Sequence, residues 1–226
     1  MRSILVIAGI IWITLSCGKK ERIKDSKEGV IEYKITYIQS NLESFPPNLL
    51  PKTMIMKYKN HMSSNTIEGF MGFFQICNIS DTKKKTNTTL LKVLDNKYLY
   101  EGKRSEPGCC FHDYENMSII PTEERKMIAG INCKKALAVF PGNESENFEI
   151  YYCDSFNVEN PNIINPFQEI DGVLMQFNLN ISSIKMNLMA EKVTFGDVPQ
   201  KEFSIPKGYT PINREKMEEV VFMLLE

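Results

Sequence analysis

The densest group of reactive residue types in this sequence lies between Cys109 and Asp113. Two thiols, the His112 imidazole and the Asp113 carboxylate fall within five residues, and zinc binds all three of these ligand types. Adjacent cysteines, however, point in different directions and rarely bind one ion together, unlike cysteines spaced by two residues. We therefore expect Cys109 and Cys110 to be disulfide-bonded or buried thiols, and we expect neither a metal site nor a cofactor.

Catalytic motifs that can be recognised in a single sequence are missing from this one. It contains no Gly-x-Ser-x-Gly segment, no His-Glu-x-x-His zinc motif and no glycine loop that would bind phosphate. The acidic residues are scattered along the chain. A glycosidase with paired carboxylates is the enzyme alternative, because two such acids meet only in the fold. We predict that the protein is not an enzyme.

Cys17 follows a segment with the properties of a secretory signal. Arg2 supplies a positive charge, and residues 4–15 are apolar apart from Gly9 and Thr14. As a helix this segment would extend only about 18 Å, whereas the hydrocarbon core of a bilayer is roughly 30 Å thick. The segment is therefore too short to span a membrane, and we interpret it as the apolar part of a signal peptide.

Residues 14–18 read Thr-Leu-Ser-Cys-Gly and resemble the lipobox of bacterial lipoproteins, although that motif prefers Leu where this chain has Thr14. The resemblance implies a signal peptide at 1–16 and a mature chain that is held to a membrane by acyl chains on Cys17. The alternatives are an ordinary cleaved signal peptide followed by a chance cysteine, or a buried N-terminal strand.

The residues after Cys17 bear on the location of the anchor. Residues 17–28 are expected to form the lipidated cysteine and a flexible polar tether. Gly18 is not the aspartate that marks retention in the inner membrane, and residues 19–22 lack the acidic cluster associated with surface export. The lipoprotein resemblance therefore implies the periplasmic face of the outer membrane.

The charge balance argues against nucleic acid as a partner. The chain has 27 Lys and Arg against 28 Asp and Glu, a net charge of −1, and the two signs are interspersed. A nucleic-acid-binding domain normally carries a basic stripe. The partners we expect are the membrane through Cys17, a hydrophobic ligand and an envelope protein.

Apolar residues alternate over much of the chain from residue 29 onward, which predicts β-strands. Ile31, Tyr33, Ile35 and Tyr37, for example, share one face of the segment 30–38. Short strands joined by tight polar turns favour one antiparallel β domain at 29–226, mainly β with some α (α+β). A helical turn is expected at 165–170 and a C-terminal helix around 217–224. The expected strands are 30–38, 54–58, 69–78, 88–94, 97–101, 130–140, 148–153, 172–180, 184–195 and 201–205.

The second half of the domain resembles a known family. Residues 126–136 follow the pattern K-x-I-x-G-x-x-C-x-K-A of the GLPGLI family of bacterial envelope proteins, and an aromatic strand follows at 148–152. Residues 170–174 stand where that family has Gly-Leu-Pro-Gly-Leu-Ile, with Glu169 and Asp171 in place of its first glycine and its proline. The resemblance implies an envelope location and, through similar sheets in periplasmic lipoprotein carriers, a curved antiparallel sheet or open half-barrel around an apolar groove. It implies no catalytic residues.

Cys133 and Cys153 are predicted to form a disulfide between neighbouring strands. A hairpin loop centred on Asn143 makes these two cysteines face each other, and the same register places apolar Ala136 opposite Ile150. An oxidising periplasm would permit the bond. The alternative is two unrelated buried thiols, in which case a bond between Cys77 and Cys109 or Cys110 is the second candidate.

Large flexible and aromatic side chains occupy alternate strand positions and suggest a hydrophobic ligand, since methionine adapts to irregular apolar shapes. The predicted function is that of a membrane-anchored envelope lipoprotein that binds a hydrophobic or lipid-like ligand in a groove of the curved sheet. The alternative is a non-catalytic interaction or structural protein whose sheet is filled by its own side chains. The predicted groove residues are Tyr33, Tyr37, Met54, Met56, Phe70, Phe74 and Met175.

Overall fold

The computed structural model describes residues 27–40, 50–69, 72–102, 106, 108–111, 114–181 and 184–225. The predicted signal peptide, Cys17 and the groove residue Phe70 lie outside the described residues, as do His112 and Asp113. Within the described residues, no helix is both long and apolar enough to cross a bilayer.

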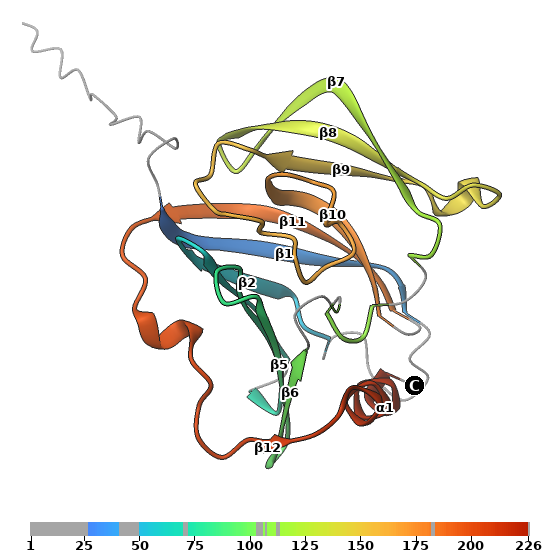
Figure 1. Cartoon of the computed structure of the whole chain (residues 1–226). Helices are drawn as coiled ribbons and strands as arrows, with labels where there is room; N and C mark the ends of the chain where they lie inside the picture. Colours follow the sequence, from blue (N-terminus) through green and yellow to red (C-terminus); the bar gives the residue numbers. More distant parts are fainter. Residues whose placement is uncertain are drawn as a thin grey trace, which may run out of the picture.

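A single curved sheet of 12 strands dominates the described part of the chain (Figure 1). Its spatial order is β12-β6-β5-β4-β3-β2-β1-β11-β10-β9-β8-β7, so that β1 lies in the middle, between β2 and β11. Neighbouring strands run antiparallel, except that β12 is parallel to β6. The strands are β1 (Glu28–Ser40), β2 (Thr53–Lys59), β3 (Met62–Glu68), β4 (Phe74–Asp81), β5 (Thr86–Val93), β6 (Asn96–Gly102), β7 (Ser118–Ile128), β8 (Ile131–Val139), β9 (Phe148–Cys153), β10 (Val173–Ile181), β11 (Ile184–Phe195) and β12 (Thr210–Pro211).

Short helical elements accompany the sheet in the described part of the chain. The 3-10 helices are η4 (Glu144–Glu146) and η5 (Gln200–Phe203), and α1 (Arg214–Leu225) lies beside β6 (Figure 1). The prediction of a mainly β fold with a C-terminal helix is confirmed.

Several predicted elements are wrong in detail. Two strands were not predicted: β3, whose residues are mostly polar, and β7, which lies in the segment between predicted strands. The strand expected at 201–205 is instead the 3-10 helix η5, and the helical turn expected at 165–170 is a succession of hydrogen-bonded turns. In both places the apolar residues are too few to establish a period of two or of 3.6.

The predicted register of β8 and β9 is confirmed, because Ala136 pairs with Ile150 and Ala138 with Phe148. Cys133 and Cys153 are both buried, but their thiols are free in the structure, and the Cys77 thiol is free as well. The disulfide between Cys133 and Cys153 is therefore not formed here and stays a prediction about the oxidised protein. Cys109 and Cys110 are joined to each other, which is one of the two states expected for them.

Alternation along the strands gives β2–β5 two different faces. We call the face that carries Met54 and Met56 the inner face, and the face that carries Ile55 and Lys57 the outer face. The inner face belongs to the main apolar core, which also contains Ile31, Tyr33 and Ile35 of β1. A smaller cluster of Ile79, Leu90 and Leu99 lies on the outer face, with Phe203 and Tyr209 packed against it. Phe167 is fully buried in the main core, where its ring packs against Tyr114, Phe148 and Phe177.

Candidate binding pocket

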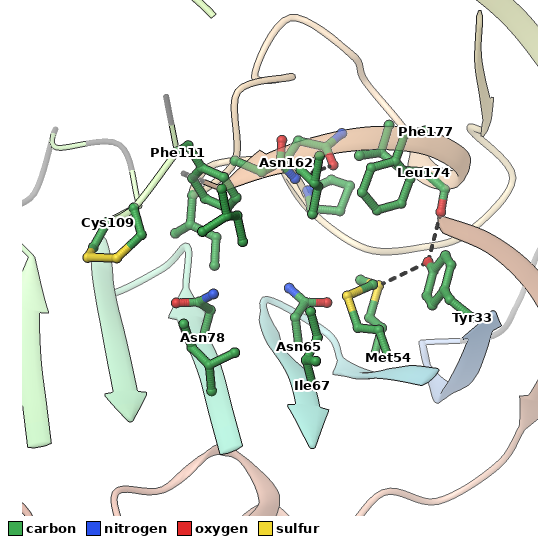
Figure 2. Close-up of a pocket in the computed structure, with 18 residues that line it drawn as sticks. Tyr33, Met54, Asn65, Ile67, Asn78, Cys109, Phe111, Asn162, Leu174 and Phe177 are labelled. Atoms are coloured by element: carbon green, nitrogen blue, oxygen red, sulfur yellow. Dashed lines mark hydrogen bonds between the residues drawn. A yellow bond between two sulfur atoms is a disulfide. The ribbon is translucent and has the colours of Figure 1, made fainter. Parts of the chain in front are cut away.

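A pocket lies between the inner face of β2–β4 and strand β10 (Figure 2). Side chains at every second strand position point to the same face, so each of these strands contributes two residues to the floor. Because Met56 pairs with Asn65 and Asn65 with Asn78, one row of the floor changes from apolar to polar across the three strands. The floor residues are Met54 and Met56 of β2, Asn65 and Ile67 of β3, and Ile76 and Asn78 of β4.

The opposite wall is provided by β10, although β1 and β11 separate it from β2 in the sheet. The curvature of the sheet brings these strands face to face. Tyr33 of β1 links them, since its hydroxyl donates a hydrogen bond of 2.7 Å to the Leu174 carbonyl and its ring packs edge-to-face on Phe177. Burial raises the pKa of the Tyr33 phenol, which is therefore a neutral hydrogen-bond donor at physiological pH. The β10 residues that line the pocket are Leu174, Phe177, Leu179 and Ile181.

Two loop segments complete the wall. Gly108 donates a backbone hydrogen bond of 3.0 Å to the Ile164 carbonyl and so holds one segment against the other. A Cβ atom at this glycine would lie 2.2 Å from the same carbonyl, so a larger residue would push the segments apart. The Asn162 amide donates to the Ile170 and Gly172 carbonyls, each at 2.8 Å, which fixes the second loop to the start of β10. The loop residues that line the pocket are Cys109, Cys110, Phe111, Pro161, Asn162, Ile164 and Asn165.

The pocket is small and uncharged. Its volume is about 60 Å³, whereas sites for drug-sized ligands usually have roughly 300–1,000 Å³. Among the described residues that line it, none is charged, and most are apolar or aromatic. The described lining residues offer apolar contact and neutral hydrogen bonds.

The structure places only some of the predicted groove residues in this pocket. Tyr33, Met54 and Met56 line it. Tyr37 does not, because its hydroxyl donates to the Pro51 carbonyl at 2.7 Å, and Phe74 packs against the main core instead. Met175 is fully buried beside a register shift between Leu174 and Gln176, which moves it out of the alternation of β10.

Several other pocket residues were not predicted. Asn65 lies on the unpredicted strand β3, and Phe177 and Leu179 reach the pocket only through the curvature of the sheet. The one available signal was the apolar alternation of β10 itself.

A second, larger hollow lies on the outer face of the same strands and has a volume of about 330 Å³. We call it the outer hollow. Its lining is mixed: apolar residues such as Ile79 and Leu90 lie beside charged ones, two of which, Lys57 and Glu202, form an ion pair with each other. Cys77 also lines it, and burial raises the pKa of this thiol.

No group of three or more His, Cys, Asp or Glu side chains lies close enough together within the described ranges to hold an ion. Since His112 and Asp113 lie outside these ranges, their arrangement around Cys109 and Cys110 is not described.

Comparisons with known proteins bear on the fold alone. No protein-family model matches the sequence, and no curated protein has a similar sequence. A similar solved structure is that of PNGF-II in a C2 space group, with a TM-score of 0.53 and 13% sequence identity over 87% of this chain and 32% of that one. The chain thus spans about a third of the length of that protein.

Proposed function

We propose that this chain is an envelope protein that acyl chains on Cys17 anchor to a membrane and that binds a hydrophobic or lipid-like ligand in the pocket between β2–β4 and β10. The observation that carries the binding proposal is the composition of the pocket. Met54, Met56 and Phe177 offer flexible and aromatic contact on facing walls, and no charge opposes an apolar group there.

The volume of the pocket limits how the ligand binds. About 60 Å³ accommodates a short apolar group and not a whole acyl chain. A longer ligand would insert its end and leave the remainder at the mouth, or it would displace the loop around Asn162. That loop contains no strand or helix, and segments of this kind open at a lower free energy than core strands.

The second candidate is a non-catalytic interaction protein, and the filled core favours it. Phe167 and Met175 are completely buried, so most of the space enclosed by the curved sheet is occupied by the protein itself. In this case the pocket would be a packing defect, and a surface of the domain would bind another envelope component.

Ligand binding is tested with the mature chain in which Cys17→Ser removes the acyl chains. Lipid extraction followed by mass spectrometry should find a co-purifying apolar molecule. A fluorescent fatty-acid probe should bind at micromolar concentration with its apolar end in the pocket and its carboxylate in solvent at the mouth. The Phe111→Ala variant should weaken probe binding, because Phe111 is partly buried and lines the pocket. Phe74→Ala is the matched control, since Phe74 is also partly buried against the core but lies outside the pocket.

The outcomes separate the two candidates. Absence of both a co-purifying lipid and probe binding would reject the binding module in favour of the interaction protein. An equal loss of affinity in the Phe111 and Phe74 variants would place the ligand elsewhere.

The anchor is tested separately by membrane fractionation. Cys17→Ala, expressed in a Gram-negative host, should yield a soluble or uncleaved product, because two or three acyl chains give stable anchoring. A correctly processed variant that still fractionates with the membrane would contradict lipidation at Cys17.

A further inference from the structure

Two asparagines face each other across the floor of the pocket. Asn65 of β3 is the register partner of Asn78 of β4, and Met56 and Thr89 flank them in the same row. Both side chains point from the strands toward the space beneath β10 and Asn162 (Figure 2). They are the polar part of a floor whose other members are Met and Ile.

The hydrogen-bonding capacity of this pair is mostly unused. The Asn78 Oδ1 atom accepts a bond of 2.8 Å from the Thr89 hydroxyl. Within the described residues, the Asn78 amide NH₂ has no acceptor, and the Asn65 amide has no partner for either its N–H or its C=O. Partly buried polar groups of this kind are satisfied by water or by a ligand.

A second asparagine pair shows that this arrangement is not forced by the sheet. Asn178 of β10 and Asn187 of β11 are also register partners, and there the Asn187 amide donates to the Asn178 Oδ1 at 2.8 Å. Paired asparagines on neighbouring strands are thus able to satisfy each other. The pair at the pocket leaves donors and an acceptor available instead.

We infer that the ligand carries an uncharged hydrogen-bonding group, such as an amide, ester or hydroxyl, which Asn65 and Asn78 bind while an attached apolar segment contacts Met54, Met56 and Ile67. This inference rests on the proposed function and specifies the ligand class for the same pocket. A carboxylate or ammonium group would lose its hydration without meeting an opposite charge, because the described lining residues are all uncharged. An asparagine amide both donates and accepts, so it serves a carbonyl and an N–H group equally well.

The test compares three probes with the same chain length, octanamide, 1-octanol and octanoate, by ligand-observed NMR titration of the mature Cys17→Ser chain. Octanamide and octanol should bind at least about tenfold more tightly than octanoate, since burial of an unpaired carboxylate is unfavourable. Asn65→Leu should weaken the binding of octanamide by about three- to tenfold, the usual effect of losing one or two neutral hydrogen bonds. The affinity for octanoate should not change in this variant. Asn187→Leu, which changes the other pair, should leave all three affinities as they are.

The variant Asn65→Asp keeps the size of the side chain, so a change in affinity there is not explained by misfolding. In Asn65→Asp the new carboxylate should repel octanoate, so the ratio of octanamide affinity to octanoate affinity should rise there and fall in Asn65→Leu. A ratio that stays the same in both variants, or octanoate binding as tight as that of octanamide, would overturn the assignment of the ligand class while pocket binding stands. Absence of binding by these probes and by the fatty-acid probe would instead reject the proposed function, and this inference with it.

Discussion

Strands β2–β5 are hollowed on both faces, and the two hollows differ in how their polar groups are satisfied. In the outer hollow, Lys57 and Glu202 form an ion pair, so charge there meets charge from within the protein. In the pocket on the inner face, the floor is apolar except for Asn65 and Asn78, whose amides are mostly without partners among the described residues.

On the proposed function, the larger hollow is not the ligand site. The outer hollow has about 330 Å³ against about 60 Å³ for the pocket, but its walls mix apolar and charged residues, and Lys57 and Glu202 there form an ion pair with each other. The volume of a hollow does not by itself identify a ligand site, whereas polar groups that have no protein partner and stand among apolar walls indicate what the site would bind. This difference can be tested by changes to one face at a time.

The largest expected effect is on stability, from the core beside the pocket. Phe167→Ala should lower the free energy of unfolding by about 3–5 kcal/mol, because a fully buried ring packed against three other aromatic rings leaves a cavity. Leu90→Ala, in the small cluster of the outer face, should lower it by about 2–3 kcal/mol. Urea unfolding measures both values. If Leu90→Ala lowered the free energy of unfolding as much as Phe167→Ala, the small cluster of the outer face would stabilise the fold as much as the main core does.

The second effect concerns the thiols of the main core and of the outer hollow. Under oxidising conditions Cys133 and Cys153 should be joined, because the confirmed register of β8 and β9, which begins at Lys134 and Tyr152, places them opposite each other when it is continued by one residue. Cys77, at the outer hollow, should stay free. Peptide mapping without reductant identifies the bond, and its reduction should cost about 3 kcal/mol of stability. Recovery of both Cys133 and Cys153 as alkylated thiols would refute the bond.

The features that could be predicted from the sequence are those determined by residues close together in the chain. The register of β8 and β9 follows from the short loop around Asn143, and the buried face of β1 follows from its own alternation, so both could be predicted. Strand β3 could not, because Ser63 and Ser64 are both buried although they point to opposite faces, and neither is apolar. Its neighbours in the sheet, and not its own pattern, make it a strand.

The pocket shows the same limit. Met54, Met56 and Tyr33 could be predicted because they alternate within their own strands. Phe177 and the loop around Asn162 join them only through the curvature of the sheet and the hydrogen bonds that fix the loop to the start of β10. Phe177 and Tyr33, whose rings are in contact, are more than a hundred positions apart in the sequence, where no local period can connect them. The Asn162 hydrogen bonds span only 8 and 10 positions, but they lie in a loop without a repeating pattern.

The third effect is a pH dependence of the reduced protein. Burial, with a contribution from Cys153, raises the pKa of the Cys133 thiol from 9.0 to about 12. Between pH 9 and 12 the Cys133 thiol is ionised in the unfolded chain but still protonated in the folded one. The free energy of unfolding is therefore unaffected by this group below pH 9 and falls as the pH rises toward 12. The loss should approach about 1.4 kcal/mol per pH unit. It is measured as the difference between the reduced protein and Cys133→Ala in urea unfolding at pH 8 to 11, and equal slopes would contradict it.

The smallest expected effect is that of the ion pair in the outer hollow. Lys57→Met should lower the free energy of unfolding by less than about 1 kcal/mol, because the Lys57 and Glu202 side chains are 34% and 28% exposed and solvent screens their attraction. A double-mutant cycle with Glu202→Gln measures the coupling by urea unfolding, and 0.5 M salt should reduce it further. Probe affinity should not change in either variant, since neither residue lines the pocket. A coupling above about 2 kcal/mol would contradict the solvent screening of this pair. A change in probe affinity would mean that the outer hollow determines the shape of the pocket, so that the two faces act as one site.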